Sequence, residues 1–252
     1  MPAMNYNQVA HYYDAYVQSE FDLQFFQEET QQITGKVLEL MCGTGRVSIP
    51  LLESGVDLTC VDSSPAMLER FREKLQDKGL SALLIEKDVT ELSLEQEFDL
   101  IFIPFHSFGE ITAVSQQRRV LDRIRVHLSR YGRFICTLHN PPFRLKTVDG
   151  LTRLAGKFPL PKNDSSLLLW RLETFDAATK IVSGYQFYEE YGPDGQLRAK
   201  SYLDINFYLH DRDSFETLVQ AAGFRVEALY GSYARETYQT PTSPVMIWIL
   251  GL

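Results

Sequence analysis

The sequence predicts an α/β fold built around a doubly wound, mostly parallel sheet. Strand-like apolar runs alternate with helix-like segments over residues 37–138. Acidic or polar residues recur directly after these strands, where the carboxyl ends of parallel strands meet at one crevice. A glycine-rich turn follows the first of them. Together these observations predict a ligand site along one edge of the sheet.

The first strand is Val37 to Leu40, and the glycine turn comes directly after it. Gly43 and Gly45 lack side chains, so a ligand can approach the backbone, and Arg46 to Leu52 begins a helix whose first N–H groups face the crevice. A Gly-x-Gly pattern alone is weak evidence, because ordinary strand-to-helix turns contain it too. The interpretation of this segment as a ligand site therefore depends on the strands that follow it.

The second strand, Leu58 to Val61, ends at Asp62. Ser64 is a typical N-cap and Pro65 a typical first residue of the next helix. A carboxylate at this strand end can accept hydrogen bonds from the two hydroxyls of a ribose. A helix-capping acid is the alternative interpretation of Asp62.

The third and fourth strands bring further polar groups to the same edge. Ala82 to Ile85 is followed by Asp88, and Phe98 to Ile103 runs into the aromatic and polar segment Pro104 to Phe108. We therefore expect Asp88 and the segment after the fourth strand to lie at the crevice.

The second half of the chain supplies the remaining elements. Gly132 separates a helix from a fifth strand, Arg133 to Leu138. A helix over Asp213 to Ala222 is followed by strands at Phe224 to Leu229 and Val245 to Leu250. These bring the number of predicted strands in the main sheet to seven.

An insertion separates the fifth strand from the last helix. A polar stretch reaches about Asp164, and three strand-like runs follow, Leu167 to Phe175, Ile181 to Tyr191 and Leu197 to Leu209, joined by turn-like residues. We divide the chain into a core of residues 1–142 and 210–252 and an inserted antiparallel β subdomain of residues 143–209. The aromatic residues of the insertion line a ligand pocket or form a sheet core or subunit interface; they are Trp170, Tyr185, Phe187, Tyr188, Tyr202, Phe207 and Tyr208.

Composition excludes several classes of protein. The formal net charge of −8 argues against nucleic acid as the main partner, and the arginines of residues 118–125 fall on the solvated face of a helix. No apolar run approaches the ~18 residues of a membrane span, and the first residues do not resemble a signal peptide, so we expect a cytoplasmic protein with no membrane partner. Cys42, Cys60 and Cys136 lack metal-ligand spacing, so we expect free buried thiols and no metal site.

These segments resemble the class I S-adenosylmethionine-dependent methyltransferases over about residues 33–140. Residues 39–45 are similar to that family's first motif, an acid followed by alternating glycines, with Asp62 at the ribose position. Asp88-Val89 resembles the position that contacts adenine, and Phe98 to Ile101 resembles the fourth motif. Met41 departs from the usual first glycine, and residues 130–132 depart from the commoner Pro-Gly-Gly turn.

The resemblance implies a Rossmann-like sheet of seven strands whose last strand is antiparallel, with the insertion serving as a lid or as the contact of a homodimer. It implies S-adenosyl-L-methionine as cofactor and a small-molecule acceptor, in an architecture similar to sugar and glycine N-methyltransferases. Tyr13 belongs to an N-terminal Tyr-Asp motif whose tyrosine closes over the cofactor's methionine end; a packing role on the first helix is the alternative. The implied cofactor-binding residues are Tyr13, Glu39, Met41, Cys42, Gly43, Thr44, Gly45, Asp62, Ser63, Met67, Asp88, Val89, Pro104 and Phe105.

Methyl transfer from a sulfonium depends mainly on alignment of the reacting groups. An amine or hydroxyl acceptor must also lose a proton, for which a histidine is suited. His106, after the fourth strand, is the first candidate for the catalytic base, and His139, after the fifth, is the second. A structural role is the alternative for both.

Three other functions stay open. The fingerprint of a nicotinamide dehydrogenase permits Ser48 as its third small residue, although it is neither glycine nor alanine. Such a fold would continue with a further crossover helix, whereas this chain ends in a helix, a strand, a loop and a strand. A catalytically inactive, regulatory protein would bind the cofactor without transferring its methyl group, and a structural protein would not bind it. The sequence leaves the acceptor, the methylated atom (N, O or C) and the oligomeric state open.

Overall fold

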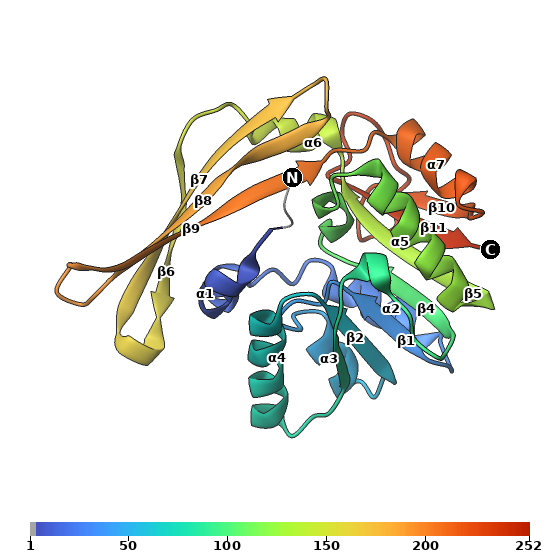
Figure 1. Cartoon of the computed structure of the whole chain (residues 1–252), viewed down its shortest axis with the longest axis horizontal. Coiled ribbons are helices and arrows are strands. Elements are labelled where there is room, and N and C mark those ends of the chain that lie inside the picture. Colours follow the sequence, from blue (N-terminus) through green and yellow to red (C-terminus); the bar gives the residue numbers. More distant parts are fainter. Residues whose placement is uncertain (1–3) are drawn as a thin grey trace.

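A computed structural model describes residues 4–252 of the chain, and its main sheet has seven strands (Figure 1). Their order is β10-β11-β5-β4-β1-β2-β3, and β11 runs antiparallel to both of its neighbours. The mostly parallel sheet and its antiparallel last strand are thus confirmed. The strands are β1 (Val37–Leu40), β2 (Leu58–Asp62), β3 (Leu83–Glu86), β4 (Phe98–Ile103), β5 (Leu128–His139), β10 (Arg225–Tyr230) and β11 (Val245–Gly251).

Helices cover both faces of this sheet. On one face α2 (Leu23–Gln31), α3 (Ser48–Glu53) and α4 (Pro65–Lys78) contribute buried side chains to one apolar cluster. On the other face α5 (Val114–His127) and α7 (Arg212–Ala221) contribute to a second. Each cluster buries one face of the same strands, which is the doubly wound arrangement that the sequence predicts.

α4 begins as the sequence predicts. The Oγ of Ser64 accepts a hydrogen bond from the backbone N–H of Met67 at 3.2 Å, and Pro65 is the first helical residue. Burial of Phe71 and Leu75 anchors the helix to the sheet, and Gly79 ends it in the left-handed conformation. These local signals place the end of β2 and the start of α4 beside the glycine turn.

The insertion is a four-stranded antiparallel sheet of β6 (Arg153–Leu160), β7 (Ser165–Asp176), β8 (Ile181–Tyr191) and β9 (Leu197–Tyr208). The three predicted strands are confirmed, but treating the residues before Asp164 as a strandless polar stretch was wrong. β6 is an edge strand that contains Gly156 and Pro159, residues that weaken a strand signal and are tolerated at an edge.

The N-terminal helix α1 (Ala10–Tyr16) lies between the inserted sheet and the core (Figure 1). Val9 and Tyr12 form an apolar cluster with Leu167, Leu169 and Tyr188 on one face of the inserted sheet. The start of the chain is therefore attached to strands far along the sequence. The division into a core of residues 1–142 and 210–252 and an insertion stays a prediction.

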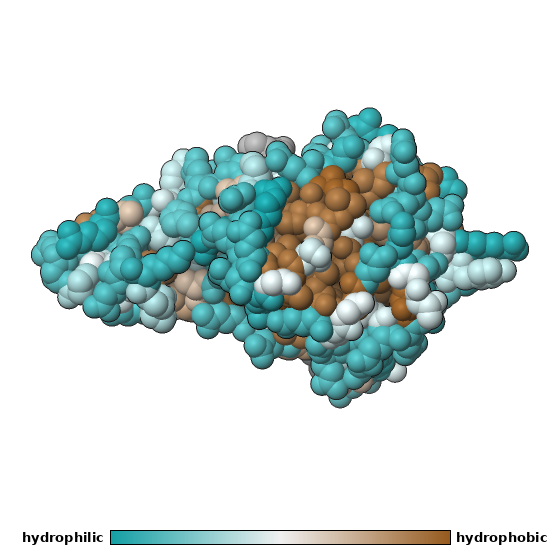
Figure 2. Space-filling model, turned by 90° about the horizontal axis from the view of Figure 1, so that it is seen from below, coloured by the Kyte–Doolittle hydropathy of each residue, from teal (hydrophilic) through white to brown (hydrophobic). Residues whose placement is uncertain are grey.

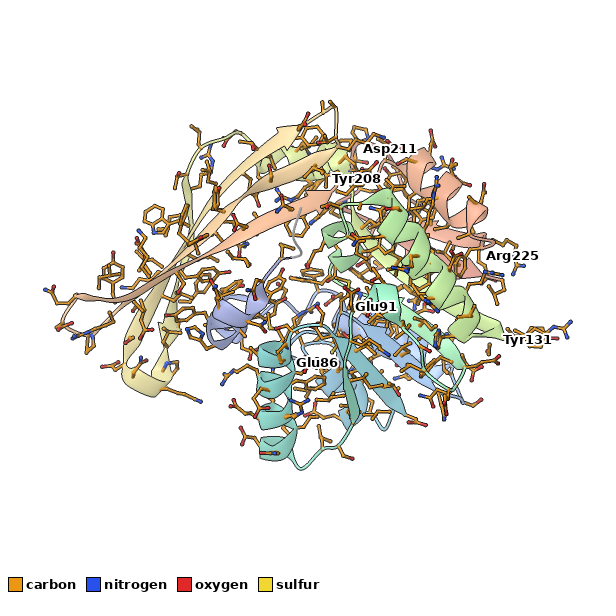
Figure 3. The ribbon with its side chains drawn as sticks, in the orientation of Figure 1. Glu86, Glu91, Tyr131, Tyr208, Asp211 and Arg225 are labelled. Carbon is orange, nitrogen blue, oxygen red and sulfur yellow. The ribbon has the colours of Figure 1, made fainter. Side chains whose placement is uncertain are left out.

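Gly132 lies within β5, so the prediction that it separates helix from strand was wrong. The register of β5 against β4 breaks between Leu128 and Arg133, and a Cβ on Gly132 would lie 2.9 Å from the carbonyl oxygen of Phe98. The neighbouring Tyr131 is 86% exposed and points away from the molecule (Figure 3). This departure from the family pattern therefore lies at the amino end of the strand, away from the crevice.

Short one-turn helices connect the larger elements and carry several residues of the site. They are η1 (Tyr6–Gln8), η2 (Val89–Glu91), η3 (Ser107–Glu110), α6 (Pro141–Arg144), η4 (Leu145–Thr147) and η5 (Pro161–Asn163). η3 directly follows β4, and α6 directly follows β5. Both therefore lie at the carboxyl edge of the sheet.

The surface, the three cysteines and the helices can be compared with what composition predicts. From below, apolar surface gathers over the core, whereas the part formed by the insertion is largely hydrophilic (Figure 2). Cys42, Cys60 and Cys136 are free and buried, as predicted. None of the helices in residues 4–252 combines the length and apolarity needed to cross a membrane. The cytoplasmic location stays a prediction.

Candidate functional site

The glycine turn after β1 is held in an unusual backbone conformation. Met41, Gly43 and Gly45 have φ angles of 59°, 56° and 80°, in the left-handed region that favours glycine. A Cβ on Gly45 would lie 2.3 Å from the ring of Phe71, whereas one on Gly43 would meet no atom within 4 Å. Gly45 thus permits close packing on α4, while Gly43 leaves open space at the sheet edge.

Asp62, at the end of β2, fastens this turn. One carboxylate oxygen accepts a hydrogen bond from the N–H of Gly43 and the other from the N–H of Ser64, both at 2.8 Å. Burial raises the pKa of Asp62 above its ordinary value, against the effect of these hydrogen bonds. Ser64, not Asp62, caps α4, so Asp62 serves the turn.

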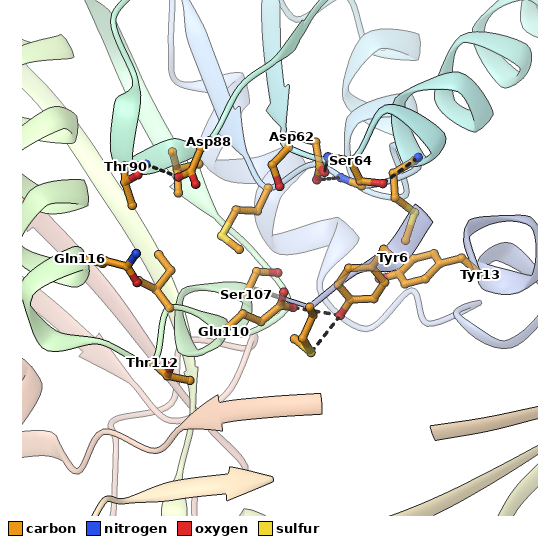
Figure 4. Close-up of a pocket in the computed structure, with 17 residues that line it drawn as sticks. Tyr6, Tyr13, Asp62, Ser64, Asp88, Thr90, Ser107, Glu110, Thr112 and Gln116 are labelled. Carbon is orange, nitrogen blue, oxygen red and sulfur yellow. Dashed lines mark hydrogen bonds between the residues drawn. The ribbon is translucent and has the colours of Figure 1, made fainter. Parts of the chain in front are cut away.

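A cleft opens where the strands end, with about 1040 Å³ of space including its solvent-open mouth (Figure 4). Asp88 lies on its rim and accepts a hydrogen bond from the N–H of Thr90 at 2.8 Å. The predicted cofactor residues that line the cleft are Tyr13, Met41, Gly43, Asp62, Ser63, Met67, Asp88 and Val89.

The other predicted cofactor residues lie outside this lining. Glu39 is buried beneath the turn, accepts a hydrogen bond from the hydroxyl of Ser48, and has its pKa raised to about 8 by burial. The residues outside the lining are Glu39, Cys42, Thr44, Gly45, Pro104 and Phe105. Their direct contact with a cofactor stays a prediction.

α1 is held against the turn through Asp14. Its carboxylate accepts hydrogen bonds from the hydroxyl of Thr44 at 2.6 Å and from the ammonium of Lys74 at 2.8 Å. The next residue back along the helix, Tyr13, lines the cleft. These contacts hold α1 so that Tyr13 lies in the wall of the cleft, and its closing over a cofactor stays a prediction.

A second cavity, of about 1070 Å³ including its mouth, lies between the core and the insertion. Phe105, His106 and His139 line it from the core, and Arg171 and Phe207 line it from the inserted sheet. Of the seven aromatic residues considered for a pocket, Phe207 is the one in this lining; Tyr188 instead packs in the sheet core.

The two histidines of this cavity form a stacked pair. Their ring centroids are 3.9 Å apart, and the backbone N–H of His106 donates to the hydroxyl of Thr137 at 3.1 Å. Burial, with Arg144 nearby, lowers the pKa of His106 to about 4, and burial also lowers that of His139. Both rings are therefore neutral at neutral pH and able to accept a proton, although as weak bases.

Tyr6, Tyr13 and Glu110 line both the cleft and the second cavity. The hydroxyl of Tyr6 donates to the carboxyl of Glu110 at 3.2 Å (Figure 4). Burial raises the pKa of Glu110 to about 8, with the Tyr6 hydrogen bond opposing the rise. These three side chains form the wall at which the two spaces meet.

Comparison with known proteins identifies proteins with a similar sequence and fold. Residues 37–132 match a family profile described as a methyltransferase domain. Over these residues the chain carries a methyltransferase domain. An S-adenosylmethionine-dependent methyltransferase from Clostridium acetobutylicum has the same fold, with a TM-score of 0.79 at 18% identity over 98% of each chain.

Two further proteins are similar to this chain over most of its length. A cypemycin N-terminal methyltransferase from a Streptomyces species is 25% identical over 219 residues, 84% of this chain and 81% of that protein. A sugar N-methyltransferase from a Streptoalloteichus species has a TM-score of 0.75 at 15% identity, covering 99% of this chain and 94% of that one. The similarity in structure extends through the insertion as well as the core.

Sequence reasoning missed several residues of the candidate site. Tyr6 and Glu110 are separated by 104 residues, and no local pattern links them. Ser107 follows the fourth strand closely enough to be expected at the sheet edge, and Arg171 belongs to a predicted strand. The missed residues used below are Tyr6, Glu110, Arg144, Arg171, Glu173 and Gln186.

Proposed function

We propose that this protein transfers a methyl group from S-adenosyl-L-methionine to a nitrogen atom of a small-molecule acceptor. One observation carries the proposal: the cleft at the strand ends and the second cavity share the wall formed by Tyr6, Tyr13 and Glu110. In-line transfer requires donor and acceptor to meet at one opening in a fixed alignment.

The residues of the cleft fit the proposed cofactor. Asp62 uses one lone pair of each oxygen on the backbone, which leaves further lone pairs for ribose hydroxyls. Asp88 uses one oxygen on Thr90 and keeps the other for an adenine amine. Met67 and Val89 supply apolar surface for the base, and Gly43 leaves space at the turn. When bound, the cofactor supplies a methyl group on a positively charged sulfur.

The shared wall favours nitrogen as the acceptor atom. Glu110 places a carboxyl group where the acceptor would enter. Above its pKa of about 8 this group is a carboxylate, which can bind a protonated amine and take up its proton. The neutral rings of His106 and His139 can take up a proton from the same cavity. Two similar proteins are described as N-methyltransferases, which agrees with this choice.

Calorimetric titration with S-adenosylhomocysteine, with NADH as control, tests the cofactor. We expect micromolar binding of the first and none of the second. Absence of binding by folded protein would contradict the proposal and favour a structural role. Binding without release of S-adenosylhomocysteine from S-adenosylmethionine with any amine would instead support the inactive, regulatory alternative.

Glu110→Gln tests the assignment of nitrogen. At pH 8.5, above the pKa of Glu110, we expect the KM of an amine acceptor to rise about tenfold, because the amide cannot take a proton, while S-adenosylhomocysteine affinity changes less than about twofold. Glu91→Gln is the matched control, since Glu91 is exposed and lines neither space. Equal KM values in both variants would remove Glu110 from acceptor binding.

A further inference from the structure

One face of β7 changes from apolar to charged along its length. Leu167 and Leu169 lie on this face and pack with Tyr12 of α1. Because side chains alternate along a strand, Arg171 and Glu173 continue the same face, and both line the second cavity. The strand thus presents two charged groups at the point where it leaves α1 and passes over the cavity.

The two charges are balanced differently. Glu173 is buried and forms an ion pair with Arg144, with 2.6 Å between a guanidinium nitrogen and a carboxylate oxygen. For Arg171, no carboxylate in residues 4–252 lies within ion-pair distance of the guanidinium. The cavity is therefore lined by a buried ion pair and, beside it, by the exposed guanidinium of Arg171, which has no counter-charge within ion-pair distance.

Gln186 adds a second donor next to Arg171. It lies directly opposite Arg171 in the register of β7 and β8, so both side chains are on the same face of the sheet. Its carbonyl oxygen already accepts a hydrogen bond from the hydroxyl of Tyr188 at 2.6 Å, and that hydroxyl lies 3.0 Å from the hydroxyl of Tyr16. This chain of hydrogen bonds fixes the amide and leaves its NH₂ group for the cavity.

We propose that Arg171 and Gln186 form an anion-binding subsite that takes a carboxylate or phosphate group of the acceptor. A planar guanidinium matches the geometry of both anions, and an adjacent amide N–H adds a further donor. The inference rests on the proposed function, because it assigns the acceptor to the second cavity. It specifies the acceptor class as an amine that also carries an anionic group, such as an amino acid or a phosphorylated amino sugar.

Binding of matched ligand pairs to the protein loaded with S-adenosylhomocysteine tests the subsite. The carboxylate pair is glycine and glycinamide, and the phosphate pair is glucosamine 6-phosphate and glucosamine. Dissociation constants are measured by NMR titration for the wild type, Arg171→Gln and Arg198→Gln. Arg198 lies on the inserted sheet outside the cavity and forms an ion pair with Asp194, so its replacement is the control with the same charge change.

We expect the anionic member of at least one pair to bind at least tenfold more tightly than its neutral partner. The pair that shows this preference identifies the anion as carboxylate or phosphate. Arg171→Gln should abolish the preference, and Arg198→Gln should keep it. Equal binding within both pairs, binding of none of the four ligands, or a preference that survives Arg171→Gln would overturn the proposal. Failure to load S-adenosylhomocysteine at the start would instead contradict the proposed function.

Discussion

The cleft and the second cavity meet at one wall but are built by different means. The cleft takes its shape from backbone conformation, in a turn whose positive φ angles and carboxylate-bound N–H groups follow from residues 41–64. The second cavity takes its shape from side chains of the core, α1 and the inserted sheet, which meet only in the folded chain. The comparison teaches that the proposed cofactor site depends on local geometry and the proposed acceptor site on packing between distant segments.

The largest effect should come from breaking the backbone of the cleft. Gly45→Ala places a Cβ 2.3 Å from the Phe71 ring at a positive φ, so we expect a loss of about 3 kcal/mol in the free energy of unfolding. Urea unfolding measures it, and S-adenosylhomocysteine binding should weaken with it. Gly55→Ala is the control, because Gly55 also has a positive φ but an added Cβ meets nothing within 4 Å. If Gly45→Ala lost only the roughly 1 kcal/mol expected for Gly55→Ala, the steric argument would be contradicted.

Beneath the same turn, Glu39 should make stability depend on pH. Its folded pKa of about 8 lies above its ordinary value of 4.5, so the unfolded chain loses this proton first as pH rises. Glu39 should therefore contribute a fall on the order of 3 kcal/mol to the free energy of unfolding between about pH 4.5 and 8. Glu110, with the same folded pKa, adds to this fall, and His106, with a folded pKa of about 4, opposes it below about pH 6.5.

Glu39→Gln should remove the contribution of Glu39, because the amide does not ionise, and leave that of Glu110. Glu53→Gln, at an exposed ion pair with Lys78, should leave both contributions in place. Urea unfolding at pH 5, 6.5 and 8 compares the three proteins. The same fall in wild type and Glu39→Gln would show that another group is responsible.

In the second cavity, His106→Asn should affect catalysis and not the cofactor. Asparagine tolerates the positive φ of 67° at this position. We expect kcat to fall about tenfold, with S-adenosylhomocysteine affinity nearly unchanged, because the ring lines the cavity on the acceptor side. His11→Asn, at an exposed position, is the control for initial rates. Unchanged turnover in His106→Asn would remove this ring from the mechanism.

The smallest effect should come from Met41→Gly. Relief of the left-handed φ of 59° offsets the greater flexibility of glycine in the unfolded chain, so stability should change by less than about 1 kcal/mol. Affinity for S-adenosylhomocysteine should stay within about twofold. A large loss of affinity would show that the Met41 side chain, and not only its backbone, serves the cleft.

The sequence predicts the cleft well because its signals are local. Strand ends, the Ser64 cap and the positions of Asp62 and Asp88 are each fixed within a few residues. β6 escaped prediction because Gly156 and Pro159 interrupt its pattern, and an exposed edge strand needs no apolar alternation. Tyr6, Glu110 and Arg171 escaped as site residues because what places them together is tertiary packing across more than 100 residues.

The position of α1 also bears on how the chain is completed during synthesis. Tyr16 and Tyr188, which meet through their hydroxyls, are 172 residues apart. A nascent chain exposes the apolar side of α1 long before the ribosome has released the strands that cover it. The first helix to be made is therefore among the last to find its partner, and the second cavity, which the inserted sheet helps to line, closes only late in translation.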